Sequence, residues 1–478
     1  AGIGGRYTAK ARAFGGRTTT TSLFANAFGG LDLRSGRLDM RWFQLNKNLE
    51  FPSGSVDSGD SLSILSVNYR GDILGTSGWK FLAGLKDWSL NQDFFSSLNE
   101  YLSDHSRNIH ISKLINWWDF EGTVQYEAEY QTFDGDKSYF NINGDPTVHH
   151  IADMERNTDA LAFVTRWSAD ADHPNIDFIN WELSYRMDQI ETFQNEHYEF
   201  PLLVTEGQPI IYDVPQSREL KHVSSKRLGI HLEGRGEKTW YSIFVNQGNN
   251  QRLPTLADLF RFSNTETDSL LDSLLSSEYL NTTELNLQLR ISNPQTELPI
   301  DEVSLGLDVF MNGYTDKIAY RVFEGTPAIP FNEPVAEIRG VEAMVGLRML
   351  SDRFLFSTSA TFLDISSPLV FPNKPEYRLV FTSELNLDWL GLSMDHVNEG
   401  EQYFFIPGIG EGLRKPRENA NLNVTLRKRL LGLDWSLSYT WRNILSKDEL
   451  DWTLEESLRH GFNYFEKYRE IINLKVEL

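Results

Sequence analysis

The stretch Glu284–Ile291, with the sequence ELNLQLRI, decides the fold class because apolar and polar residues alternate in it without exception. Every second residue is Leu or Ile, and the residues between them are Glu, Asn, Gln and Arg. Successive side chains of a β-strand point to opposite faces, so the stretch predicts a strand with one apolar and one polar face. The same period of two is found in Asn180–Asp188 and in Asp434–Trp441.

Two architectures produce strands of this kind. A soluble antiparallel sandwich places the apolar faces inside, whereas a membrane barrel turns them toward lipid and encloses the polar faces in a wet lumen. The lengths of the predicted connections favour the barrel, because short and long connections alternate along the chain. The predicted short turns lie at Leu431–Gly432, Leu390–Gly391, Ser351–Arg353, Gly234–Lys238 and Asp170–Pro174; the predicted long loops are Ser446–Glu470, Gly400–Ala420, Ser366–Glu376, Glu324–Ala336, Gln194–Leu220 and Phe133–Arg156.

Short turns on one rim and long loops on the other are typical of outer-membrane barrels. The sequence therefore predicts an all-β fold, a single transmembrane antiparallel β-barrel of about 20 strands, closed into one sheet over residues 6–478. Several tryptophans lie near predicted strand ends, where amphipathic rings favour the lipid headgroup boundary: Trp42, Trp79, Trp117, Trp118, Trp389, Trp435 and Trp441.

Composition narrows the function. The 478 residues carry a formal net charge of −22, which argues against a nucleic-acid partner, and they contain no Cys, which excludes disulfides and thiolate chemistry. The sequence contains no run of about 18 apolar residues, so it predicts no transmembrane helix. Motifs of catalysis, phosphate binding and calcium loops of standard spacing are absent from the sequence. We therefore expect no enzyme activity, no cofactor and no dedicated metal site.

A family resemblance emerges at QRLPTLADLF, residues Gln251–Phe260. The segment resembles the Arg-x-Pro-Thr-Leu-x-Glu-Leu-Phe motif of TonB-dependent outer-membrane receptors, with Asp258 in place of Glu. Two later segments, SSEYLNTTELNLQLR and NEPVAEIRGVEAMV, resemble strands of the same family and follow in the expected order. The matching positions include Arg252, Pro254, Thr255, Leu256, Leu259, Phe260, Glu278, Glu284, Leu285, Asn332, Ile338, Gly340, Val341 and Glu342.

The resemblance implies a 22-stranded barrel in the outer membrane that imports a scarce ligand, such as a metal chelate, cobalamin or a glycan. It also implies partners: outer-membrane lipid and lipopolysaccharide, a plug domain or a separate plug protein, and the TonB complex. Residues 1–5 would then be the junction between a plug and the barrel. A second hypothesis is a plugless barrel that serves as a structural anchor or passive pore, associated with other outer-membrane or surface proteins; a third is a soluble all-β binding protein.

Two segments, the motif segment and one predicted loop, give predictions about individual residues. Pro254 is predicted to start a helical turn just outside the membrane, where it disrupts no strand pairing. In the predicted loop Phe133–Arg156, Asp134, Asp136, His149 and His150 are candidate ligand contacts, since carboxylates and imidazoles can bind metals or chelates. The alternative for these four residues is an ordinary solvated loop.

Overall fold

A computed structural model gives the fold of the chain. It describes residues 2–12, 19–50, 56–73, 75–94, 98–140, 146–173, 175–195, 197–201, 212–214, 216–262, 275–294, 299–321, 328–406, 410–414, 416–430, 433–446 and 469–477. Within these residues almost every segment is a β-strand, and the one α-helix is short. The all-β fold class predicted from the alternating sequence is confirmed.

The strands succeed one another as an antiparallel meander. The first half comprises β1 (Gly2–Arg12), β2 (Thr19–Leu33), β3 (Gly36–Glu50), β4 (Val56–Ile73), β5 (Thr76–Phe94), β6 (Leu98–Trp117), β7 (Phe120–Phe140), β8 (Pro146–His173), β9 (Ile176–Gln194), β10 (His197–Pro201), β11 (Tyr212–Val214) and β12 (Ser217–Arg235). The second half comprises β13 (Thr239–Arg252), the helix α1 (Leu256–Phe262), β14 (Glu278–Ser292), β15 (Ile300–Arg321), β16 (Ile329–Met349), β17 (Phe354–Ile365), β18 (Tyr377–Asn386), β19 (Leu390–Glu399), β20 (Gln402–Ile406), β21 (Gly410–Arg414), β22 (Arg417–Leu430), β23 (Leu433–Arg442), the 3-10 turn η1 (Ile444–Ser446) and β24 (Arg469–Glu477).

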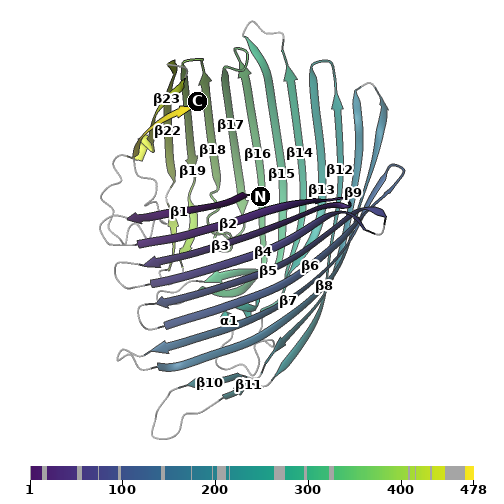
Figure 1. Ribbon diagram of the computed structural model, residues 1–478, viewed down its shortest axis with the longest axis vertical. Helices are drawn as coiled ribbons and strands as arrows, with labels where there is room; N and C mark the ends of the chain where they lie inside the picture. Colours follow the sequence, from purple (N-terminus) through teal and green to yellow (C-terminus); the bar gives the residue numbers. More distant parts are fainter. Residues whose placement is uncertain are drawn as a thin grey trace.

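The main sheet contains 22 strands in the described part of the chain, and β20–β21 form a separate hairpin. Two of the 22, β10 and β11, are a short extension beside β8, because β9 pairs directly with β12. The other twenty strands each pair with their neighbour along the chain and curve into two facing walls (Figure 1). The predicted count of about 20 strands is therefore confirmed.

The seam of the barrel differs from the expectation of one closed sheet. Among the described pairings β1 pairs with β2 and β24 pairs with β23, and none joins β1 to β24. At the N-terminal end, residues 2–5 pair with Ala25–Phe28 and belong to β1, although the sequence suggested a junction there.

Most of the described connections sort by rim as predicted. Tight turns join β2 to β3, β12 to β13 and β16 to β17 at one rim, and β13 continues into β14 through α1 at the opposite rim. The connection from β14 to β15 lies at the first of these rims although it is longer than a tight turn, and the turn predicted at Leu431–Gly432 lies outside the described residues. Figure 1 shows the two rims at opposite ends of the strands. We call them the short-turn rim and the long-loop rim. The turn predicted at Leu390–Gly391 lies slightly earlier, since β19 already begins at Leu390.

The prediction of a long loop over Phe133–Arg156 is wrong. Strand β7 continues to Phe140 and β8, with 28 residues, begins at Pro146, so most of this segment is paired sheet. A tilted strand needs only about 9–11 residues to cross a bilayer. Strands β4–β9 have 18–21 residues apart from β8, so they extend past the membrane and raise the wall at the long-loop rim. Alternation alone does not reveal where a strand leaves the lipid.

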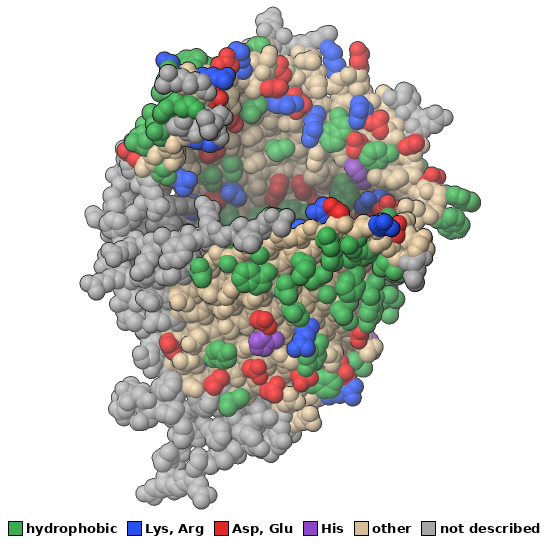
Figure 2. All heavy atoms as spheres, viewed as in Figure 1, with side chains coloured by type: hydrophobic (Ala, Val, Ile, Leu, Met, Phe, Trp, Pro, Cys, Tyr) green, Lys and Arg blue, Asp and Glu red, His purple; other side chains and the backbone are tan. Residues whose placement is uncertain are grey.

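The two faces of the sheet differ as the period of two predicts. Exposed apolar side chains such as Leu183, Leu228 and Leu307 all occupy the outward face. Figure 2 shows apolar side chains gathered on the outer face of the nearer wall, toward its short-turn rim, while charged side chains are visible in the hollow behind the edge of that wall. Tryptophans Trp117, Trp118 and Trp389 are 67%, 88% and 60% exposed at the short-turn rim, in agreement with a boundary position. Within the described residues, no helix is long and apolar enough to span a membrane.

Candidate functional site

The helix α1 is the feature that departs from the barrel pattern, and its start is fixed by its own sequence. The backbone N–H of Asp258 donates to Thr255 Oγ1 at 3.0 Å, and the backbone N–H of Thr255 donates to Asp258 Oδ2 at 2.9 Å. This reciprocal pair is a capping box, which satisfies donors that a helix start leaves unpaired. The helix begins at Leu256, so Pro254 precedes the cap and is not its first residue, in contrast to the prediction.

One side of α1 packs against the inner face of the raised wall. Leu256, Leu259 and Phe260 are at most 5% exposed and form one apolar cluster with Leu102, Phe133, Ala152 and Met154 of β6–β8. The rings of Phe260 and Phe133 lie 5.9 Å apart. Gly135 makes room for this contact, because a Cβ atom there would lie 3.0 Å from the Phe260 ring. The helix is thus seated inside the barrel mouth and does not project into solvent.

An ion pair fastens the end of α1 to the same wall. Arg261 donates from Nε and Nη2 to the two carboxylate oxygens of Glu100 on β6, at 3.1 and 2.6 Å. The Glu100 side chain is fully buried and that of Arg261 is 17% exposed. Burial by itself lowers the pKa of Arg261, but the neighbouring Glu100 carboxylate outweighs it, so the pKa lies above its ordinary value. Two-pronged guanidinium–carboxylate contacts of this kind are geometrically specific.

A second polar contact anchors the segment just before the helix. Arg156 on β8 donates from Nη1 to the carbonyl oxygen of Pro254 at 2.9 Å and from Nε to Thr192 Oγ1 at 3.2 Å. The chain therefore enters α1 tied to the strands β8 and β9.

The other side of α1 is tied to the opposite wall. Tyr320 on β15 donates its hydroxyl to Asp258 Oδ1 at 2.8 Å. Glu278 at the start of β14 accepts from the backbone N–H of Ile318 at 3.0 Å and pairs with Lys317 at 3.4 Å. Arg252 lies between the two carboxylates, 3.8 Å from Asp258 and 4.0 Å from Glu278. Together these contacts connect α1 to β6–β8 on one side and to β14–β15 on the other, so the helix joins the two walls at the long-loop rim.

The predicted family-motif residues fall into two groups. Arg252, Pro254, Thr255, Leu259, Phe260 and Glu278 gather around α1. Glu284, Gly340 and Glu342 lie farther down the inner wall of β14–β16, where Gly340 is opposite Phe310 and Glu342 is opposite Asp308. Sequence reasoning missed Glu100, Arg156 and Tyr320, which are distant in sequence and carry no motif of their own.

The candidate ligand contacts are separated by the strand geometry. Asp134 and Asp136 alternate with Phe133 and Gly135, which face α1, so the two carboxylates point away from the lumen. His149 and His150 lie on β8, opposite Ser138 and Lys137 of β7; their side chains lie outside the described residues. In the described part of the chain, no group of three or more His, Asp or Glu residues has a metal-binding arrangement.

Below α1 the inner wall carries a network of charged side chains. Arg186 on β9 pairs with Glu127 on β7 and with Asp188 on its own strand, the latter at 2.8 Å. His110 Nδ1 lies 2.8 Å from the other oxygen of Glu127, and on the neighbouring strands Lys86 pairs with Asp104 at 3.3 Å. The sequence predicted this polar inner face from the alternation. Cations and anions alternate on it, so the field inside the lumen is mixed.

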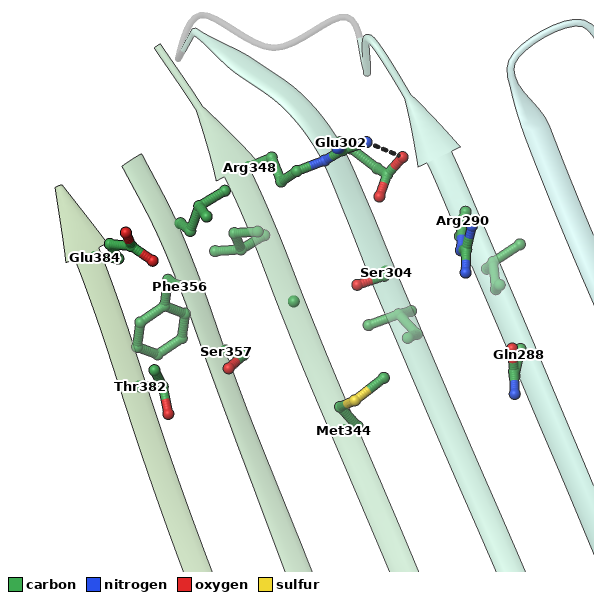
Figure 3. A pocket seen from close by; sticks show the side chains of 15 residues that line it. Gln288, Arg290, Glu302, Ser304, Met344, Arg348, Phe356, Ser357, Thr382 and Glu384 are labelled. Atoms are coloured by element: carbon green, nitrogen blue, oxygen red, sulfur yellow. Dashed lines mark hydrogen bonds and ion pairs between the residues drawn. The ribbon is translucent and has the colours of Figure 1, made fainter. Parts of the chain in front are cut away.

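A hollow of about 480 Å³ opens on the inner wall near the short-turn rim. Figure 3 shows Arg290, Ser304, Ser357, Thr382 and Glu384 around it, with Arg348 joined to Glu302 at 2.7 Å along its edge. Gly346 leaves space at its centre, because a Cβ atom there would lie 2.3 Å from Ser304 Oγ. The arrangement is a polar recess that can accept hydrogen-bonding groups from whatever occupies the lumen.

Comparison with known proteins relates this geometry to one group of solved structures. No family model matches the sequence, and no curated protein matches it. The structure of the copper transporter OprC superposes with a TM-score of 0.69 and 11% identity, covering 96% of this chain and 71% of that one. The ferric-catecholate import receptor Fiu from E. coli K12 gives a TM-score of 0.61 with 11% identity, over 98% of this chain and 75% of that one.

A third similar structure is the hemophore receptor HasR of Serratia marcescens, in complex with its hemophore HasA and heme. Its TM-score is 0.60 with 11% identity, over 92% of this chain and 72% of that one. Identities this low establish the fold alone. The chain has the fold of the β-barrel of TonB-dependent outer-membrane receptors.

Proposed function

We propose that the chain is the barrel of a receptor that imports a scarce ligand across the outer membrane. The observation that carries the proposal is the seating of α1, which is tied to both walls of the mouth above a polar lumen. A passive pore has no need for a helix held across its mouth by a buried ion pair. A receptor that binds ligand outside and releases it inside does need a structured, narrowed mouth.

The ligand classes are a metal chelate, cobalamin or a glycan. The similar structures concern copper, a ferric catecholate and heme, so a metal or metal chelate is the first class to test. Transport of this kind involves binding at the long-loop rim and rearrangement of a plug driven by the TonB complex, without covalent chemistry. A plug domain or separate plug protein would face the inner wall, where the hollow beside Arg290 and Ser304 offers polar groups.

Ligand contact by His149 and His150 remains a prediction, and their position near the outer end of β8 is compatible with it. Asp134 and Asp136 face outward, so a ligand descending through the lumen would not meet them. For these two residues a role at the outer surface fits the geometry better.

Uptake by cells tests the proposal. Cells that produce the complete reading frame and cells that lack it are given a labelled ferric catecholate, heme and cyanocobalamin, with and without a protonophore. Import predicts accumulation of one probe and not of the others, abolished when the protonophore dissipates the proton gradient.

The competing hypotheses give different results in the same assay. A passive pore would admit small labelled solutes without selectivity and without sensitivity to the protonophore. A structural anchor would leave the uptake of all probes unchanged while altering the integrity of the outer membrane. Either pattern would overturn the import proposal.

A further inference from the structure

A serine, a histidine and an aspartate form a continuous hydrogen-bonded series on the raised wall. Ser103 Oγ lies 3.0 Å from His105 Nε2, and His105 Nδ1 lies 2.9 Å from Asp87 Oδ1. Ser103 and His105 are on β6, and Asp87 is on β5, directly opposite His105. The three residues match no catalytic sequence motif, because one of them comes from a neighbouring strand.

The series faces away from the lumen. Ser103 alternates along β6 with Leu102, which belongs to the apolar cluster around α1 on the inner face. Toward the long-loop rim, the outward row that contains the exposed Leu85 is followed by the row of Asp87 and His105 and then by the row of Ser103. The side chains of His105 and Asp87 are 50% and 65% exposed. The series is therefore open to molecules outside the barrel.

The two ring nitrogens of His105 have the roles that acyl transfer requires. The Asp87 carboxylate accepts the hydrogen of Nδ1, so in the neutral ring Nε2 is left to accept the proton of the Ser103 hydroxyl. A nucleophile beside a base, with a third group that orients the base, is the geometric signature of an activated serine. Asp87 is thus a positioning residue, whereas Ser103 and His105 are the groups that meet a substrate.

The surroundings of Ser103 limit the acyl group that can reach it. Ser103 is 5% exposed and stands between the larger side chains of Tyr101 and His105 on the same face of β6. A carbonyl carbon can reach such a recessed hydroxyl only at the end of a small acyl group, such as acetyl. The hydroxyl of Ser89 on β5 is the nearest cross-strand donor for the developing oxyanion, because Ser89 is directly opposite Ser103 and the Cβ atoms of such pairs lie about 4.5–5.5 Å apart.

Carboxylates on the other side of Ser103 favour a cationic substrate. Asp134 of β7 is directly opposite Ser103, and Asp153 of β8 is directly opposite Asp134, all on the outward face. Within the described residues neither carboxylate forms an ion pair with Lys or Arg. Like charges directly opposite each other in a sheet are unfavourable, and a cation bound beside them relieves the repulsion.

We propose that Ser103, His105 and Asp87 form an esterase site that cleaves small acyl esters of cationic alcohols. Ser103 Oγ bonds to the carbonyl carbon while its proton passes to His105 Nε2. The bond from that carbon to the alcohol oxygen then breaks, and Nε2 gives the proton to the departing alcohol, which leaves an acyl-serine. Solvent water attacks the acyl carbon and gives a proton to Nε2, and the bond to Oγ breaks as Oγ regains that proton. The products are a carboxylic acid and a cationic alcohol.

Hydrolysis of two matched thioesters tests the site. The purified protein in detergent is given acetylthiocholine and its neutral isostere 3,3-dimethylbutyl thioacetate, and the released thiol is measured with a chromogenic disulfide reagent. The chain contains no Cys, so the protein itself gives no signal with this reagent. We expect thiol release above the buffer rate for both substrates, with kcat/KM about tenfold higher for the cationic one because of the neighbouring carboxylates.

Covalent labelling identifies the nucleophile without any substitution. A fluorophosphonate probe reacts with an activated serine with loss of fluoride. Mass spectrometry of the digested protein is expected to find the probe on Ser103. Labelling of a different serine, or the absence of labelling, would overturn the proposal.

Variants separate the roles of the residues. Ser103→Ala is expected to reduce thiol release to the buffer rate, and Asp87→Asn to lower kcat about a hundredfold or more with little change in KM, since Asp87 acts by orienting the base. Asp134→Asn should raise the KM of the cationic substrate toward that of the neutral one. Ser106→Ala is the matched control and should keep the parent rate, because Ser106 is also a buried serine of β6 but faces the lumen.

The same measurements define failure. Parent-like release by Ser103→Ala, or an equal loss with Ser106→Ala, would remove Ser103 as the nucleophile. Equal kcat/KM values for the two thioesters would overturn the cationic substrate class. The assay requires neither a plug nor a proton gradient, so its failure is distinguishable from a failure of the import proposal.

Discussion

Arg261 and Glu100 are 161 residues apart in sequence, yet they form a buried two-pronged ion pair that joins the end of α1 to β6. The pair is a tertiary contact and not part of a strand pairing, and it joins the segment after β13 to the wall that contains β6. Because Glu100 is fully buried, its charge depends on Arg261 for compensation.

Removing either partner is expected to loosen the mouth. Arg261→Ala or Glu100→Ala leaves an uncompensated charge in an apolar setting, which typically costs about 3–5 kcal/mol. Hydrogen exchange measured by mass spectrometry should show α1 losing protection while β14–β16 keep theirs. The double variant should cost less than the sum of the two single variants; strict additivity would mean that the pair contributes nothing as a pair.

The capping box makes a second prediction about α1. Thr255→Ala removes the side-chain acceptor for the Asp258 N–H and is expected to destabilise the helix by about 1 kcal/mol. Thr255→Ser keeps the hydroxyl and should retain the protection of the α1 amides. If both substitutions changed the exchange of α1 equally, the cap would have no role in holding the helix.

Gly340 offers a test of packing on the inner wall. A Cβ atom at this position would lie 2.3 Å from Phe310 Cζ and 2.9 Å from Leu363 Cδ2, so Gly340→Ala must displace an aromatic ring. Overpacking of this kind costs about 1–3 kcal/mol. Gly313→Ala on the neighbouring strand β15 is the control, because nothing lies within 4 Å of its Cβ position.

Denaturant unfolding of the barrel in lipid vesicles measures the difference between the two glycine variants. We expect Gly340→Ala to lower the midpoint, and Phe310→Leu to restore part of it in the double variant. Equal midpoints for Gly340→Ala and Gly313→Ala would show that the Phe310 ring moves aside without cost.

The sequence predicted the repeated strands and the rim at which each turn lies, because both follow from local patterns. The alternation in Glu284–Ile291 is set by the two faces of one strand, and the short connection predicted at Ser351–Arg353 joins the paired strands β16 and β17. The motif at Arg252–Phe260 also located the helical turn correctly to within two residues.

Contacts between distant segments were not predictable in the same way. Nothing local to Glu100 indicates that its partner is Arg261, because that pairing depends on how far the strands rise beyond the membrane. The same extension placed Asp134 and Asp136 on a strand when the sequence suggested a loop. Where a strand ends is decided by pairing with its neighbours, and β7 and β8 remain paired from Phe120 and Trp167 to Phe140 and Pro146.

The assignment of the two faces can be tested with a single pair of adjacent residues. Leu287 pairs with Ile243 and Leu307 on the outward face, and Gln288 pairs with Ser242 and Gly306 on the inner face. Leu287→Arg places a charge in lipid and is expected to destabilise the barrel by about 2–4 kcal/mol near the bilayer midplane. Gln288→Arg places the same charge in the wet, mixed-charge lumen and should be tolerated. Because the substitutions differ by one position in one strand, local strand propensity cannot explain a difference between them. A larger loss of stability in vesicles for Gln288→Arg would mean that the lipid-facing and lumen-facing sides have been exchanged, and equal losses would contradict the assignment of two different faces.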